Sequence, residues 1–334
     1  MVGMFSFCDD LHRIYQEDYN RYVDVDREFG NYKQSAVKCD YSSKICNLWL
    51  FKSETLSNQN FIIVPSLFNS PEILFFNKDQ NYIEYMKSFG NVYLLEWIET
   101  TDVLKLSDYA QDVAKVVKFT KYTKSGFVNL VGHCIGGNIA IFSMFIENDI
   151  NSLTLLTTPW DYSHFASSCL LSECLEIKKA IHGLNTVPKI YIQMMFFMLF
   201  PNHYKAKMNK YFSLDKAEAR EKYLRIEQWL QSGIDIPSSL YNEILDDIIA
   251  KNFLVNKNLY INNKLVSLDQ IDVPTCIISA KDDQIAPISS IVPLQKEIKK
   301  STLILVDGGH INYLVNNDQK FKQDYTKWFV YQRS

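Results

Sequence analysis

A six-residue segment near the middle of the chain has the composition of a catalytic turn. The segment 132–137, GHCIGG, follows the apolar run 127–132 and precedes the apolar run 138–146, which predicts a strand, a sharp turn and a helix. Such a turn presents a nucleophile in a strained backbone conformation, and small flanking residues avoid a clash between strand and helix. Cys134 stands at the tip, and a helix N-terminus beyond it stabilises a thiolate. The alternative is a tight turn around an inert, buried cysteine; we expect His133 to point away from the site and pack in the core.

A cysteine nucleophile needs a base, and the base needs an orienting acid. Asp282 and Asp283 come just after one predicted strand, and His310 comes just after the next. Alone, an acidic turn residue is usually solvated and a lone histidine is usually structural. The order nucleophile, acid, histidine on successive strand ends is that of α/β-hydrolases. Asp283 is the better acid, because the Asp-x-x-x-Pro sequence leaves its carboxylate in the loop that faces the site. We therefore predict Cys134, Asp283 and His310 as the catalytic residues.

An oxyanion hole should accompany this nucleophile. The backbone N–H of Ile135, the residue after the cysteine, is the first expected donor. The second should come from the turn that follows the predicted strand 61–65, at Ser66 or Leu67. An ordinary surface turn at this place is the alternative.

The elements around these residues alternate in type, which is typical of an α/β fold with a mostly parallel sheet. Between positions 162 and 268 strand signals become rare, and helix formers, Met, Phe and Tyr dominate. We predict an N-terminal extension (1–45), an α/β-hydrolase core (46–161 and 269–334) and a helical cap inserted into it (162–268). The predicted strands are 46–51, 61–65, 92–97, 127–132, 152–158, 275–280 and 302–306; the predicted helices are 82–89, 107–121 with Ser107 as N-cap, 138–146, 291–299 and 319–331.

Composition excludes several other classes of protein. The 334 residues are 47% hydrophobic and carry a net charge of −3, which gives no electrostatic reason to expect nucleic acid. Seven cysteines cannot all pair, and no C-x-x-C motif suggests a metal site. The first residues lack the basic start of a secretory signal. The uncharged apolar stretch 190–202 is shorter than the roughly 20 residues that span a bilayer. These features predict a cytoplasmic protein without a metal, a cofactor or a transmembrane segment.

At the catalytic residues the sequence resembles the catalytic subunit of poly(3-hydroxyalkanoate) synthases, especially the short, two-subunit type called class III. That family has a G-x-C-x-G-G box, as positions 132–137 do here. The present sequence departs from the family pattern at Ser70, Glu72, Glu96 and Gln284. Further matches lie, in order, at SLFNSPEIL (66–74), VYLLEW (92–97), LSDYA (106–110), TTPWDY (157–162), YLRIEQWL (223–230), DDQIAP (282–287) and GGHI (308–311), so the resemblance covers roughly 61–328.

The resemblance implies an acyltransferase that polymerises (R)-3-hydroxyacyl-coenzyme A, with 3-hydroxybutyryl-CoA as the expected monomer. His310 would deprotonate Cys134, the acyl group would move to sulfur with release of coenzyme A, and the hydroxyl of a second unit would extend the polyester. Asp283 would orient His310 or help to activate that hydroxyl. Coenzyme A enters as part of the substrate. The implied partners are the growing polyester, a second copy of the chain and a helical second subunit, and the implied location extends to the surface of polyester granules. Two other classes stay open: a cysteine thioesterase, esterase or depolymerase of the same fold, and a non-catalytic granule or assembly protein.

Overall fold

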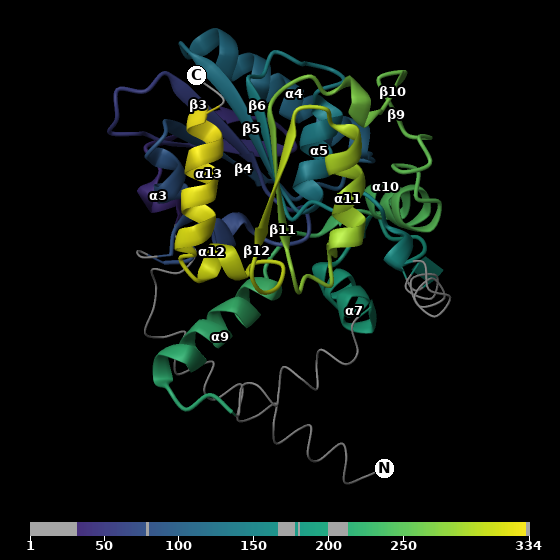
Figure 1. Cartoon of the computed structure of the whole chain (residues 1–334). Helices are drawn as coiled ribbons and strands as arrows, with labels where there is room; N and C mark the ends of the chain where they lie inside the picture. Colours follow the sequence, from purple (N-terminus) through teal and green to yellow (C-terminus); the bar gives the residue numbers. More distant parts are fainter. Residues whose placement is uncertain (1–31, 78–79, 166–177, 180, 200–212, 332–334) are drawn as a thin grey trace.

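The computed structural model describes residues 32–77, 80–165, 178–179, 181–199 and 213–331. Its centre is an eight-stranded sheet in the order β1-β2-β4-β3-β5-β6-β11-β12 (Figure 1). The six strands from β4 to β12 in this order run parallel, and β1 and β2 are antiparallel to their neighbours. The predicted, mostly parallel α/β sheet is confirmed. The strand bounds are β1 Lys38–Ser42, β2 Cys46–Phe51, β3 Gln59–Val64, β4 Asn91–Trp97, β5 Phe127–His133, β6 Ser152–Leu156, β11 Thr275–Ala280 and β12 Ser301–Val306.

Helices cover both faces of the sheet and create two hydrophobic cores (Figure 1). The first core lies under α4 (Leu106–Thr123), α5 (Ile135–Ser143) and α11 (Ile288–Glu297). The second lies under α3 (Tyr82–Lys87), α12 (Asn312–Val315) and α13 (Gln319–Tyr331). Because strands such as β3 and β11 are buried along their whole length, their near-continuous apolar sequences fit a sheet covered on both sides.

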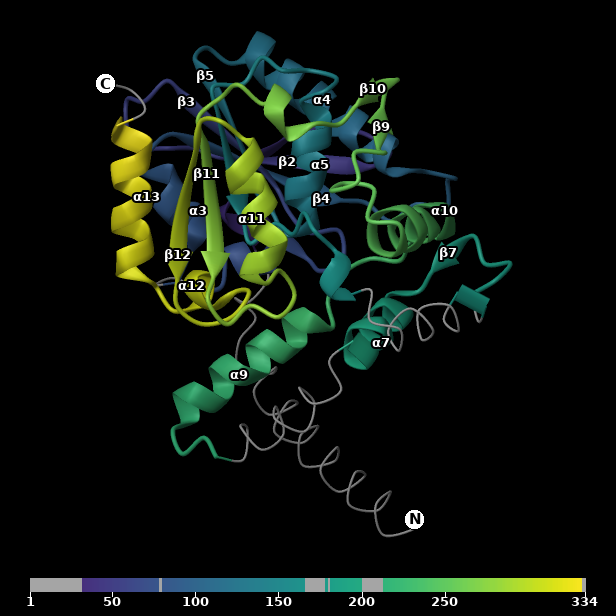
Figure 2. The same ribbon diagram turned by 45° about the vertical axis from the view of Figure 1, so that its right-hand side comes forward.

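The segment 162–268 leaves the sheet and contributes most of the structure beyond the carboxyl ends of the strands. Figure 2 shows α7 and α9 past the carboxyl ends of β11 and β12. The same segment also contains two short two-stranded sheets, β7 with β8 and β9 with β10. The sequence did not indicate these strands. The elements of this segment are η2 Ser163–Phe165, β7 Thr186–Val187, α7 Lys189–Leu199, α9 Ala217–Leu230, β8 Ile236–Pro237, α10 Ser238–Glu243, the π-helix η3 Ile244–Ala250, β9 Tyr260–Ile261 and β10 Lys264–Leu265.

Three local expectations need correction. Helix α4 begins at Leu106, so Ser107 is not its N-cap; the Asp108 carboxylate accepts the N–H of Lys105 at 2.8 Å and closes the first turn instead. Helix α5 begins directly after Cys134, because glycines expected in the turn belong to its first turn. At the other edge, β1 adds an antiparallel strand within a segment that was predicted to lie outside the core.

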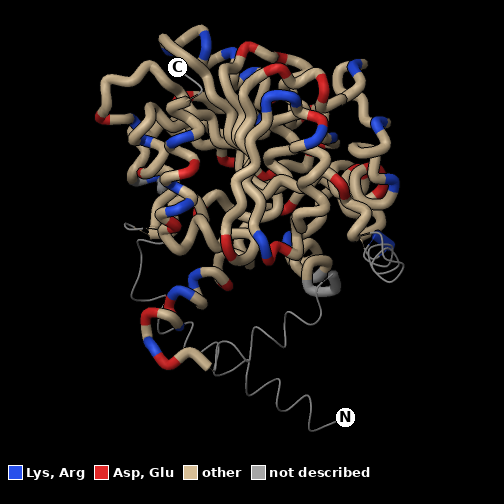
Figure 3. The backbone as a smooth tube through the Cα atoms, viewed as in Figure 1, with Lys and Arg blue, Asp and Glu red and all other residues tan. Residues whose placement is uncertain are grey.

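The surface agrees with the near-neutral charge balance. Figure 3 shows acidic and basic residues interspersed along the chain rather than gathered by sign. Within the residues that the structure covers, no helix is both long enough and apolar enough to cross a membrane. Cys39, Cys46, Cys134 and Cys276 are free thiols.

Candidate active site

Cys134 occupies the strained turn that its sequence predicts. It connects the end of β5 to the start of α5 with φ 54° and ψ −132°, a region of backbone space that residues with a Cβ rarely adopt and that is typical of functional sites. The side chain is nearly buried, with 9% exposure. The turn therefore holds a single thiol at the N-terminus of a helix, where backbone N–H groups lack partners within the helix.

A close approach fixes the position of this turn against the end of β3. A Cβ atom at Gly136 would lie 2.2 Å from the carbonyl oxygen of Pro65, so only glycine fits. Trp97 holds the same carbonyl by donating its indole N–H at 3.1 Å. The segment that follows β3 is thus packed directly on the first turn of α5.

Asp283 and His310 meet at the carboxyl ends of β11 and β12. The Nδ1 atom of His310 lies 2.7 Å from Oδ2 of Asp283. The other oxygen of Asp283 accepts the N–H groups of Ile285 and Ala286 at 2.8 and 2.9 Å. Because Nδ1 is engaged by the acid, Nε2 is the ring atom left for the nucleophile, and Cys134 is near enough to contribute to the raised pKa of His310. The structure brings the three predicted catalytic residues together.

The charges of His310 and Asp283 stabilise each other. Burial opposes a charged ring on His310, but the charges of Asp283 and Cys134 and the hydrogen bonds to both raise the pKa of His310 above its usual value. Burial likewise opposes ionisation of Asp283, yet His310 and two backbone donors lower the pKa of this carboxyl. The side chains of Asp283 and His310 are only 0% and 10% exposed. The arrangement therefore stabilises an imidazolium on His310 beside the Asp283 carboxylate.

The sequence predicted that His133 points away from the site and packs in the core. The residue is buried, but its side chain does not point away from the site. Its ring centroid lies 5.7 Å from that of His310. Burial and the neighbouring charge of His310 lower the pKa of His133 to about 3. His133 is thus a neutral neighbour of the base, and a second positive charge next to His310 is avoided.

Several polar residues lie around the triad that the sequence did not predict to belong to the site. Thr157, with φ 43°, donates its hydroxyl to the carbonyl of His310 at 3.2 Å. Tyr162 donates to Asn138 at 3.0 Å, and burial together with the negative charge of Cys134 holds the pKa of the Tyr162 hydroxyl well above its usual value. His164, which had no recognisable context in sequence, has its Nε2 3.0 Å from the carbonyl oxygen of Ile285 in the acid loop. The only sequence signal was the Thr-Thr-Pro-Trp-Asp-Tyr segment directly after β6.

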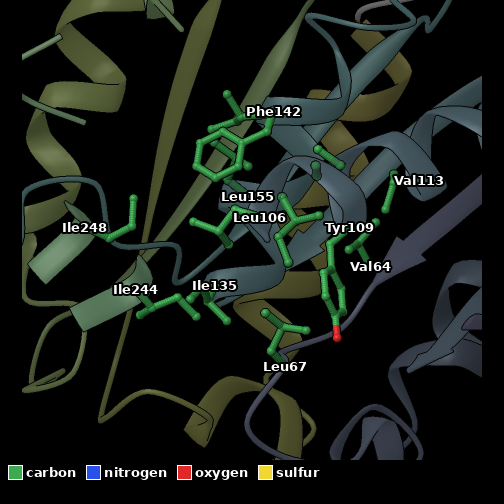
Figure 4. Close-up of a cluster of buried hydrophobic side chains, with 14 of the residues drawn as sticks. Val64, Leu67, Leu106, Tyr109, Val113, Ile135, Phe142, Leu155, Ile244 and Ile248 are labelled. Carbon is green, nitrogen blue, oxygen red and sulfur yellow. The ribbon is translucent and has the colours of Figure 1, made fainter. Parts of the chain in front are cut away.

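The expected oxyanion donors lie on adjoining segments. Ile135 is the first residue of α5, so its N–H has no acceptor one turn earlier in that helix. Ser66 and Leu67 directly follow Pro65, which contacts the same helix turn. Figure 4 shows Leu67 and Ile135 in one cluster of buried side chains with Ile244 from the segment 162–268. The role of these N–H groups stays a prediction.

The acid can be identified by a pair of neighbouring substitutions. We expect Asp283→Asn to reduce acylation of Cys134 by roughly 10²-fold to 10⁴-fold, because the carboxylate holds the His310 ring and its charge. Asp282→Asn is the matched control: this residue is exposed, and its variant should be nearly normal. Single-turnover acylation rates measure both, and a reversal of their order would show that the acid is assigned wrongly.

Comparison with known proteins places this geometry in context. A family model described as alpha/beta hydrolase fold matches residues 96–317. The chain is 25% identical over 280 residues to the poly(3-hydroxyalkanoate) polymerase subunit PhaC of Haloferax mediterranei, covering 80% of this chain and 57% of the relative. It is 24% identical over 269 residues to the subunit of the same name from Thiocystis violacea, covering 76% and 75%. The chain thus spans somewhat more than half the length of the haloarchaeal relative.

Solved structures resemble the chain in fold. MenH from S. aureus superimposes with a TM-score of 0.57 at 14% identity, over 86% of this chain and 99% of that one. A thermophilic esterase from Thermogutta terrifontis gives a TM-score of 0.56 at 13% identity, over 90% and 98%. At such identities the likeness concerns the fold alone. With the family model matched over a stretch that includes Cys134, Asp283 and His310, the chain belongs to the alpha/beta hydrolase fold family.

Proposed function

We propose that this protein is a polyhydroxyalkanoate synthase, an acyltransferase that forms polyester from (R)-3-hydroxyacyl-CoA through a cysteine acyl-enzyme. The observation that carries the proposal is the Cys134 thiol in the strained turn between β5 and α5, beside the hydrogen-bonded pair of His310 and Asp283. A thiolate suits an acyl group that arrives as a thioester, because exchange between two thioesters is nearly isoenergetic. The relatives named as polymerase subunits support the same choice.

The reaction then has two half-steps. The Cys134 thiolate attacks the thioester carbonyl, the bond from carbon to the coenzyme A sulfur breaks, and the His310 imidazolium supplies the proton that the leaving thiolate takes up. In the second half-step His310 accepts the proton of a hydroxyl group on another hydroxyacyl unit. That oxygen attacks the acyl-enzyme, and the bond to the Cys134 sulfur breaks to give the ester and the free thiolate.

Asp283 acts in this scheme by orienting His310 rather than by activating the hydroxyl directly. One carboxylate oxygen faces Nδ1 of His310 and the other accepts two backbone N–H groups. The side chain has no exposed surface. A substrate hydroxyl would have to displace one of these partners to reach it.

Water must stay away from the acyl-enzyme if polymer rather than free acid is to form. The nearly buried base and acid support this requirement. The apolar helix α7 contributes Ile192 and Met195 to the same hydrophobic core as Ile135. Ordinary packing explains these contacts equally well, so the product of the reaction, and not the packing, must decide.

The decisive experiment measures coenzyme A release from 3-hydroxybutyryl-CoA and identifies the product. We expect polymer, with a lag that shortens when a polyester primer or a helical second subunit is added, because exposed apolar residues of the segment 162–268, such as Leu184 and Ile190, can bind a hydrophobic chain or a partner. We also expect the purified protein to self-associate and, in cells, to gather on polyester granules in the cytoplasm.

Other products would support other functions. Free 3-hydroxybutyrate, released without a lag by a dilute monomer, would indicate a cysteine thioesterase. Cleavage of added polyester without synthesis would indicate a depolymerase. An absence of any acyl-enzyme would indicate a granule or assembly protein that has kept the fold.

A further inference from the structure

A cluster of hydrogen bonds joins helix α9 to the segment after β3, far from it in sequence. The indole N–H of Trp229 donates to the carbonyl of Ser70 at 2.8 Å. The side-chain amide of Asn69 donates to the carbonyl of Leu230 at 3.2 Å. Ser232 accepts the N–H of Ser70 at 3.1 Å, and the two serine hydroxyls are 2.9 Å apart. With a longer bond from the Asn69 amide to the carbonyl of Trp229 at 3.5 Å, five hydrogen bonds tie the end of α9 and the turn after it to Asn69 and Ser70.

The backbone itself is closely packed at this junction. A Cβ atom at Gly233, whose φ is 122°, would lie 2.5 Å from the carbonyl oxygen of Phe68. On its other side, the Phe68 ring makes an edge-to-face contact with Phe196 of α7, with 5.6 Å between centroids. Helices α7 and α9 thus both contact the residues that directly follow Ser66 and Leu67.

Helix α9 also contacts the segment that follows His310. Lys222 lies seven residues before Trp229, which places the two side chains on nearly the same face of the helix. Its ammonium group donates to the carbonyl of Val315 and to the side chain of Asn316, at the end of the short helix that follows His310. Figure 2 shows α9 beneath α12 and the strand ends. One helix therefore contacts both the segment after β3 and the segment after the catalytic histidine.

We propose that α9 is a positioning element for the oxyanion hole, with Trp229, Ser232 and Asn69 as positioning residues. By holding Phe68 to Ser70, they fix the backbone N–H of Leu67 or Ser66 beside the first turn of α5. The inference rests on the proposed acyl-transfer function, since only attack on a carbonyl needs this donor.

The test compares two tryptophan variants that each lose an indole N–H and the same part of a buried ring. Trp229→Phe removes the bond to Ser70. Trp328→Phe is the matched control, because Trp328 is similarly buried and its Nε1 has no partner in the part of the chain that the structure describes. We expect Trp229→Phe to slow acylation of Cys134 by about 10-fold to 10²-fold, somewhat less than complete loss of an oxyanion donor. Trp328→Phe should acylate at the normal rate.

A second readout separates this role from general damage. Alkylation of Cys134 by iodoacetamide needs the thiolate but no oxyanion hole, so it should be unchanged in Trp229→Phe. Ser232→Ala should reproduce the selective loss, and Ser232→Thr, which keeps the hydroxyl, should restore acylation. Equal losses of acylation and alkylation, normal acylation in both Trp229→Phe and Ser232→Ala, or an equal loss in Trp328→Phe would each overturn the proposal.

The choice of acyl donor keeps this inference distinct from the proposed function. Each variant is acylated with 3-hydroxybutyryl-CoA and, separately, with p-nitrophenyl butyrate. If only the activated ester acylates the wild-type protein, the polyester proposal fails while the tryptophan comparison still decides the role of α9. If neither donor acylates Cys134, both proposals fail.

Discussion

Cys134→Ala should abolish coenzyme A release and leave the protein folded. The thiol is the only atom of this side chain that can hold the acyl group, and alanine keeps the Cβ, so the strained turn at φ 54° is the same in both proteins. Cys134→Ser should be severely slowed rather than dead, because a hydroxyl at neutral pH needs far more activation than a thiol.

The measurement pairs coenzyme A release with mass spectrometry of the intact protein, which detects the acyl-enzyme directly. Thermal unfolding of the wild type and both variants is the control for folding. Near-normal turnover by Cys134→Ala would refute the mechanism, whatever the product.

His310→Ala should lose roughly 10²-fold to 10⁴-fold in the rate of acylation, the usual contribution of a positioned general base. It should also lose stability, by about 3–5 kcal/mol, because the carboxylate of Asp283 would remain buried without its charged partner. His310→Gln, whose amide can still donate to Asp283, should be equally inactive but more stable, so the two effects can be measured apart.

The pH dependence of this stability follows from the directions of the two pKa shifts. The pKa of His310 is raised in the folded protein, so its contribution is complete below the unfolded value of about 6.5 and is lost as pH rises through the folded value. The pKa of Asp283 is lowered, so its contribution is present above about 3.9 and is lost as pH falls through the folded value. The difference in free energy of unfolding between the wild type and His310→Gln should therefore be largest between about pH 4 and 6.5. A difference that does not decline as the pH leaves this range in either direction, or activity retained by His310→Ala, would contradict the assignment.

Cys134, Asp283 and His310 could be predicted from the sequence because each lies in a recognisable local pattern and the three follow one another in a characteristic order. A glycine-flanked cysteine between an apolar strand and a helix defines its own turn, and Asp283 and His310 each follow a strand by a few residues. Since adjacent parallel strands end at the same edge of a sheet, their order along the chain is enough to bring the acid and base together.

Other features depend on contacts that no local pattern encodes. The start of α4 is decided by Asp108 and by the N–H of Leu106, which donates to Glu243 at 2.7 Å. The ring of His133 faces His310 because the strand end and the base loop converge there in space. In the same way, β1 is recognisable only through its pairing with β2, because its sequence is polar and its residues are largely exposed. Sequence reasoning therefore predicted the three residues that the structure brings together, but not the contacts that His133, Thr157 and His164 make around them.

The junction between Trp229 and Ser70 also has a consequence for recombination between relatives. The two residues are 159 positions apart, so a crossover that exchanges only 162–268 separates a helix from the loop it was selected with. The smallest exchangeable module is discontinuous: it consists of this helix and the stretch from Ser66 to Leu74 together. Chimaeras assembled on that boundary keep the hydrogen bonds between α9 and Asn69 and Ser70 within one parent, and chimaeras assembled on the continuous boundary mix two parents at this junction.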